Sequence, residues 1–97
     1  MFHGEYKMPG GKLVIVEFRL AGNRLSEVVV SGDFFLYPDE VLLDITGALE
    51  GMPADLVETG VAARVRAAIP AGAELLGTSP EAIAIATRRA LDGAGAP

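Results

Sequence analysis

The sequence predicts an α+β domain, in which a three-stranded antiparallel sheet, arranged as a meander, is followed by about three helices packed on one face. All six aromatic residues lie within the first 37 positions, where the Val-rich segments 14–16 and 28–30 also lie, and aromatic and β-branched residues both favour strands. Twelve of the 15 alanines lie after residue 60, which indicates helices. The 97 residues suffice for one domain, expected over 1–92, and 51% of them are hydrophobic, which supports a buried core rather than disorder.

The sheet is predicted over about residues 3–32. His3 to Lys7 forms the first strand, and a type II turn with Pro9 and Gly10 at its centre returns the chain. Two longer strands are predicted over Lys12–Leu20 and Leu25–Ser31. In the first, every second residue from Val14 to Leu20 is apolar and the other face is mixed, which is the period-two pattern of a half-buried strand.

Gly22 and Asn23 tolerate positive φ, so they predict a two-residue hairpin between the longer strands. In that register Val16 faces Val29, and Phe18 faces Glu27. The register therefore leaves one charged residue on the apolar side of the sheet.

Three helices are predicted over about residues 38–50, 54–69 and 80–91. The first starts at Pro38, with acidic residues in its first turn, and the second ends before Pro70. Ser79 is the expected N-cap of the third helix, ahead of a proline at its first position. Residues 93–97 are expected to form a flexible tail.

Composition excludes several functional classes. The net charge of -5 argues against nucleic acid or an anionic membrane surface as the main partner. No apolar run is long enough to span a bilayer, and the N-terminus lacks the layout of a signal peptide, which predicts a cytoplasmic protein. With no cysteine, thiol catalysis, disulfides and iron–sulfur chemistry are excluded. The prediction is a chain without catalytic or metal-binding residues.

The first candidate site is the turn at Pro9, Gly10 and Gly11, flanked by Lys7 and Lys12. A phosphate-binding loop needs a helix after its glycines, whereas here a strand follows, so a hairpin turn is the simpler interpretation. The two lysines are either a solvated strand end or a pair of cations, close together across the turn, that meets an anionic ligand.

The second candidate site is the segment Gly32-Asp33-Phe34-Phe35. Adjacent residues of an extended segment point to opposite sides, so the two phenylalanines cannot both enter the core. The segment is either a contact platform or a turn in which one phenylalanine fills the core. His3, near the terminus, has no evident partner for acid–base work, and Arg88 and Arg89 most simply complement the dipole of the last helix.

Together these segments resemble the lipoate–protein ligase accessory domain. The resemblance rests on the string Tyr6-Lys7-Met8-Pro9-Gly10-Gly11-Lys12-Leu13, on Ser31-Gly32-Asp33-Phe34-Phe35 after a hairpin, and on a helix opening with Pro38-Asp39-Glu40. It extends from about Glu5 to Gly51 and is only architectural from there to Leu91. The domain occurs at the C-terminus of single-chain ligases and as a separate small subunit of bipartite ones.

The resemblance implies a non-catalytic accessory subunit that works with a large catalytic subunit. Since the chain has no room for a catalytic domain, it resembles the separate small subunit. The complex would use ATP, magnesium and lipoate to form lipoyl-adenylate and would then serve lipoyl-acceptor domains, with none of these cofactors bound by this chain alone. Residues expected to face the partner or the adenylate are Lys7, Pro9, Gly10, Gly11, Lys12, Gly32, Asp33, Phe34 and Phe35.

Two functions of other classes compete with this one. Iron–sulfur assembly scaffolds share a similar small fold, but their chemistry needs cysteine, which this chain lacks. A stand-alone small-molecule binding or protein-interaction module, dimeric through the aromatic segment, stays open as the alternative.

Overall fold

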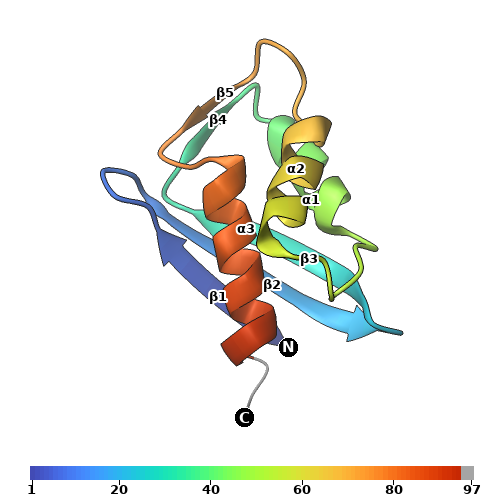
Figure 1. Cartoon of the computed structure of the whole chain (residues 1–97). Helices are drawn as coiled ribbons and strands as arrows, with labels where there is room; N and C mark the ends of the chain where they lie inside the picture. Colours follow the sequence, from blue (N-terminus) through green and yellow to red (C-terminus); the bar gives the residue numbers. More distant parts are fainter. Residues whose placement is uncertain (95–97) are drawn as a thin grey trace.

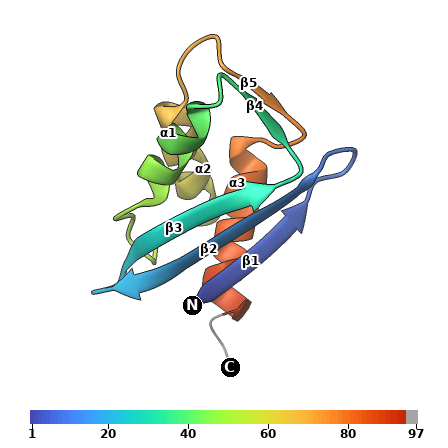
Figure 2. The same cartoon turned by 180° about the vertical axis from the view of Figure 1, so that it is seen from behind.

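The alternating segments at the start of the chain form a three-stranded antiparallel sheet with the order β1-β2-β3, and helices cover one of its faces (Figures 1 and 2). The computed structural model describes residues 1–94. Its elements are β1 Phe2–Lys7, β2 Leu13–Ala21, β3 Arg24–Gly32, β4 Phe35–Tyr37, α1 Val41–Leu49, α2 Glu58–Ala68, β5 Glu74–Leu76, α3 Pro80–Arg89 and a π-helical turn Ala90–Ala94. The predicted α+β fold class is confirmed.

The core lies between the sheet and the helices. Val14, Val16 and Phe18 alternate along β2 and are fully buried, and the ring of Phe18 stacks on Phe2 with centroids 5.5 Å apart. The helices contribute the buried side chains of Val41, Ile45, Leu49, Val61, Val65 and Ile83. Because each such burial is worth about 1.5–3 kcal/mol, this layer carries most of the fold's stability.

Gly4 allows α3 to lie directly against β1. A Cβ atom at this position would overlap the carbonyl oxygen of Ala86 and the backbone of Ala90. The N-terminus of α3 is fixed as expected, since the backbone N–H of Ala82 donates to the Ser79 hydroxyl at 3.0 Å. Small residues on both elements therefore set the close sheet–helix spacing.

The hairpin register differs from the predicted one beyond the turn. Leu20 faces Leu25 as expected, but Val16 pairs with Val30, because β3 carries an extra residue at a bulge opposite Phe18. Glu27, with φ of 52°, lies at this bulge. The predicted contact of Phe18 with Glu27 on the apolar side is therefore wrong.

The bulge turns the Glu27 side chain out to solvent, where its carboxylate lies 3.3 Å from Arg19 Nε. The carboxylate of Glu50, just after α1, accepts the backbone N–H groups of Glu27 and Val28 at 3.2 and 3.1 Å. The two N–H groups, which the bulge takes out of the pairing with β2, thus still have a hydrogen-bond acceptor.

Two helices begin later than predicted. α1 begins at Val41 because the chain turns through Pro38–Glu40 first, with the Val41 N–H donating to the Pro38 carbonyl at 3.0 Å. α2 begins at Glu58 rather than near residue 54, because Pro53 forms a β-bridge with Arg24. Of the predicted tail, Gly93 and Ala94 belong to the π-helical turn, and residues 95–97 lie outside the described residues.

A second, two-stranded sheet was not predicted. β4 pairs with β5 in antiparallel register, with Phe35 opposite Leu76 and Tyr37 opposite Glu74. Each strand has only three residues, too few to show a period, and they lie far apart in the sequence. This β4–β5 ribbon stands at the end of the main sheet that carries the β1–β2 turn (Figure 1).

Candidate functional site

The structure brings the two predicted site segments together at one end of the sheet. The Asp33 N–H donates to the Leu13 carbonyl at 3.2 Å, which joins the end of β3 to the start of β2. The Lys12 N–H donates to the Gly77 carbonyl at 2.8 Å, which joins the same point to the loop after β5. The Pro9–Lys12 turn and the Gly32–Phe35 segment, about 20 residues apart in the sequence, are therefore held side by side.

The Pro9–Gly10 turn has the predicted form. Gly10 has φ of +73°, and the Gly11 N–H donates to the Met8 carbonyl at 2.8 Å, as a type II turn requires. A Cβ atom at Gly11 would collide with the Met8 side chain, and the hydroxyl of Ser79 points at the Met8 sulfur at 3.8 Å. The turn is therefore packed against the loop before α3.

The two lysines leave the hairpin on different sides. Lys7 lies opposite Leu13, and strand alternation places it on the outer face with Glu5. The Cβ and Cγ atoms of Lys12 instead lie against Gly77, beside the start of α3. Both lysines are exposed, and within residues 1–94 neither forms an ion pair.

In the Gly32–Phe35 segment the two phenylalanines divide as predicted. Phe34 is half-buried against the core, with its ring edge over Gly32, where a Cβ atom would also overlap the Leu13 carbonyl oxygen. Phe35 is 66% exposed on β4. Phe34 is therefore the phenylalanine that packs against the core, and Phe35 is the exposed one.

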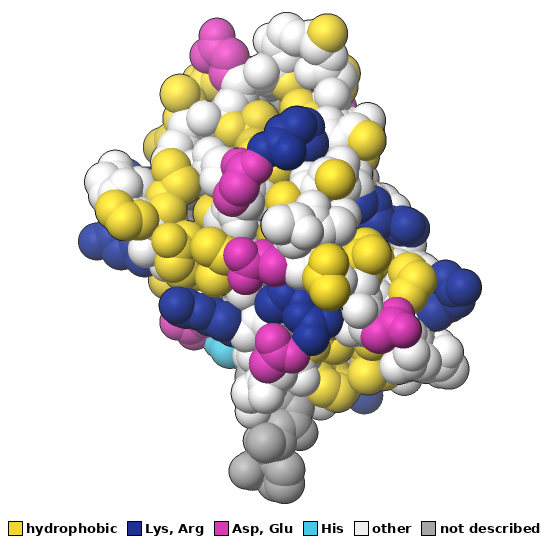
Figure 3. Space-filling view, in the orientation of Figure 1, with side chains coloured by type: hydrophobic (Ala, Val, Ile, Leu, Met, Phe, Trp, Pro, Cys, Tyr) yellow, Lys and Arg dark blue, Asp and Glu magenta, His cyan; other side chains and the backbone are white. Residues whose placement is uncertain are grey.

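Sequence reasoning missed two further exposed residues beside Phe35. Tyr37, two residues along β4, and Leu76, opposite Phe35 on β5, are also exposed. The spacing of Phe35 and Tyr37 was a usable signal, because alternate residues of a strand share a face. Figure 3 shows hydrophobic side chains gathered over the region of the ribbon.

A hollow of ≈ 370 Å³ opens next to Phe35, between the end of β3 and the start of α1. Its lining includes Val30, Gly32, Phe34, Phe35, Asp39 and Leu42. Three of the predicted site residues therefore border one concave surface, together with a carboxylate from the turn before α1.

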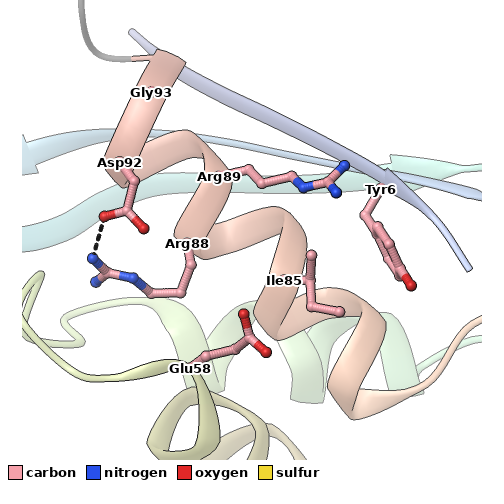
Figure 4. Close-up of a pocket in the computed structure, with 7 residues that line it drawn as sticks. All are labelled: Tyr6, Glu58, Ile85, Arg88, Arg89, Asp92 and Gly93. Carbon is pink, nitrogen blue, oxygen red and sulfur yellow. Dashed lines mark hydrogen bonds and ion pairs between the residues drawn. The ribbon is translucent and has the colours of Figure 1, made fainter.

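A second hollow, of ≈ 630 Å³, lies between β1, α2 and the end of α3 (Figure 4). Arg88 donates to the carbonyl oxygens of Ala54 and Leu56, at 2.7 and 3.1 Å, and pairs with Asp92. Arg89 lies over the ring of Tyr6, 4.9 Å from its centroid. Both arginines therefore fasten α3 to neighbouring segments, beyond the dipole role expected of them.

His3 has partners, contrary to the sequence interpretation. Its Nδ1 lies 2.8 Å from Glu17 Oε2 and its Nε2 lies 2.6 Å from Glu5 Oε2, on the outer face of the sheet. Hydrogen bonds to Glu17 and then Glu5 raise the pKa of His3, because both ring nitrogens donate only in the protonated form. The strand register, Glu17 opposite His3, creates this cluster.

Among residues 1–94, no three His, Asp or Glu side chains converge in a way that would hold a metal ion. In the same part of the chain, no helix combines the length and the apolar character needed to cross a membrane. What the described residues do offer is a fixed turn, an exposed aromatic ribbon and a shallow hollow, which are features of a recognition surface.

The fold is that of a small α+β domain. No protein-family model and no curated protein matches the sequence. A solved structure of an archaeal lipoylation system, a bi-partite lipoate protein ligase and its E2 lipoyl domain from Thermoplasma acidophilum, contains a chain with the same fold. The two chains superpose with a TM-score of 0.67 and 24% identity, over 91% of this chain and 94% of that one.

Proposed function

We propose that this chain is the non-catalytic accessory subunit of a bipartite lipoate–protein ligase and acts in the cytoplasm. Its fold matches, over nearly its whole length, a chain from a bi-partite lipoate protein ligase system. The observation that carries the proposal is the convergence, in this fold, of the Pro9–Lys12 turn and the Gly32–Phe35 segment at one end of the sheet. These are the segments in which the sequence resembles the accessory domain.

In this proposal the bonds are made and broken on the catalytic subunit, which binds ATP, magnesium and lipoate. A carboxylate oxygen of lipoate attacks the α-phosphorus of ATP, pyrophosphate leaves, and lipoyl-adenylate forms. The amine of an acceptor-domain lysine then attacks the lipoyl carbonyl, and AMP leaves. The accessory chain contributes by covering the pocket, excluding water and ordering a loop of its partner.

The direct test is reconstitution of the adenylation step. Lipoyl-adenylate is measured by mass spectrometry with the catalytic subunit alone, this chain alone and the mixture. The proposal predicts product in the mixture only. Equal product without this chain, together with no binding between the two proteins, would contradict it.

Lys7 and Lys12 are the cations that would approach the adenylate or the ATP phosphates. Replacing both by alanine is expected to lower adenylation about tenfold, as for loss of a charge-assisted hydrogen bond, and to leave complex formation unchanged. Complex formation and adenylation are measured separately. Unchanged adenylation would remove the lysines from the mechanism.

The second candidate is a stand-alone small-molecule binding module, favoured by the hollow of ≈ 370 Å³ beside Phe35. Calorimetric titration of the isolated chain with ATP and with lipoate separates the two functions. The accessory function predicts no measurable binding of either ligand, whereas a stand-alone binding module for these ligands predicts saturable binding without a partner.

A further inference from the structure

One face of the β4–β5 ribbon carries three exposed apolar side chains beside Glu74. Phe35, Tyr37 and Leu76 are 66%, 58% and 48% exposed, and strand pairing places them on one side of the ribbon. These three side chains are called the ribbon patch. Clustered aromatic and aliphatic side chains of this kind, rather than scattered ones, mark a surface that a partner covers.

Acidic side chains border the ribbon patch. Asp39 lines the hollow beside Phe35, and Glu74 lines a further hollow of ≈ 390 Å³ with Tyr37. No lysine or arginine lines either of these hollows in the described part of the chain. Lys12 lies nearby, held by its stem against Gly77, which follows Leu76.

The sequence explains this one-sided charge. Between Arg24 and Arg64 there is no lysine or arginine, whereas the stretch contains eight acidic residues. Four of the eight lie away from the ribbon patch, and Glu27 among them pairs with Arg19. The other four flank β4, between the end of β3 and the first turn of α1: Asp33, Asp39, Glu40 and Asp44. Such a surface favours a partner of positive charge.

We propose that the ribbon patch docks in an apolar pocket bordered by lysine and arginine side chains on the catalytic subunit. This inference rests on the proposed function. The acidic border argues against a second copy of the chain as the occupant, because a symmetric contact would place like charges opposite each other. In the complex the ribbon patch would be buried and would supply most of the binding energy. The carboxylates of Asp39 and Glu74 would pair with the basic border and orient the two subunits.

The experiment measures the affinity of this chain for the catalytic subunit of the same source, by biolayer interferometry at 50 and 500 mM NaCl. One variant removes the anchors, Phe35→Ser with Tyr37→Ser. A second reverses the border, Asp39→Lys with Glu74→Lys. Matched controls are Val57→Ser, another exposed apolar residue, and Asp55→Lys with Glu58→Lys, which changes the net charge equally.

The control positions lie at the opposite end of the sheet, since the Ala54 N–H donates to the Asn23 carbonyl in the β2–β3 turn at 2.9 Å. We expect each patch variant to raise the dissociation constant at least about tenfold, and the control variants to stay within about twofold. High salt is expected to weaken the wild type about tenfold and the border variant far less. Circular dichroism establishes that every variant is folded.

The possible outcomes distinguish failure of the docking site from failure of the proposed function. If the wild type binds and activates the catalytic subunit but the patch variants bind equally well, the docking site is wrong and the proposed function stands. If the wild type neither binds nor activates, both fail. A wild-type dimer in sedimentation that Phe35→Ser with Tyr37→Ser converts to a monomer would make a second copy the occupant and overturn the inference.

Discussion

Phe18 on β2 and Phe35 on β4 show how differently two regions of this small chain are used. Phe18 is fully buried between Phe2 and the helices, whereas Phe35 is mostly exposed on the β4–β5 ribbon. The sheet–helix layer gathers the buried apolar side chains, while the ribbon leaves three large ones in solvent. The residues of the proposed docking patch are therefore different from those that stabilise the fold, so mutation can test the two roles apart.

The largest expected effect of a substitution on the free energy of unfolding is at Phe18. Phe18→Ala removes a fully buried ring and leaves a cavity, so we expect a loss of about 3–5 kcal/mol in the free energy of unfolding. Phe35→Ala is the matched control and should change that free energy by less than about 0.5 kcal/mol. Urea denaturation followed by circular dichroism measures both. A similar loss in the free energy of unfolding at both positions would mean that Phe35 also stabilises the fold.

A smaller effect is expected at Glu50, whose carboxylate accepts two N–H groups from the β3 bulge. Glu50→Ala should lower the free energy of unfolding by about 1 kcal/mol, because the bulge donors turn to water. Asp55→Ala, at an exposed carboxylate with no hydrogen bond to the sheet, serves as the control. If Glu50→Ala were as stable as the wild type, the hydrogen bonds from the bulge to Glu50 would not contribute to stability.

The smallest effect concerns pH and His3. Its pKa is raised in the folded chain by Glu17 and Glu5, so the stabilisation is fully present below the unfolded value of 6.5. It is lost as pH rises through the folded pKa. The wild type should therefore be more stable than His3→Gln at mildly acidic pH, and this difference in stability should disappear as the pH is raised to alkaline values. Because the His3 side chain is 43% exposed, the difference is small, and thermal unfolding scans of both proteins measure it. A pH-independent difference would contradict the account of His3.

Local patterns in the sequence determined most of the main sheet and the third helix. Alternation identified the buried residues of β2, the Pro9–Gly10 pair predicted its turn, and Ser79 marked the start of α3. Each of these features depends on neighbours within a few residues, and a pattern of residue types is enough to reveal it.

The features that were missed depend on contacts between distant segments. The bulge at Glu27 is supported by Glu50, and the β4–β5 ribbon pairs residues 35–37 with 74–76. The partners of His3 likewise follow from strand register rather than from its neighbours alone. For the candidate site, the prediction included Phe35 but missed Tyr37, although its spacing from Phe35 was a usable signal. Leu76 could not be found in this way, because only the pairing of β4 with β5 brings it beside Phe35.

The accessory role is best tested by titrating this chain into a fixed amount of catalytic subunit, with ATP and lipoate present. The account predicts that the rate of lipoyl-adenylate formation rises with added chain and saturates near one equivalent. The Phe35→Ser with Tyr37→Ser variant, although folded, should need much more protein to reach the same rate. A rate that does not change as the wild-type chain is added would contradict the assignment of an accessory subunit.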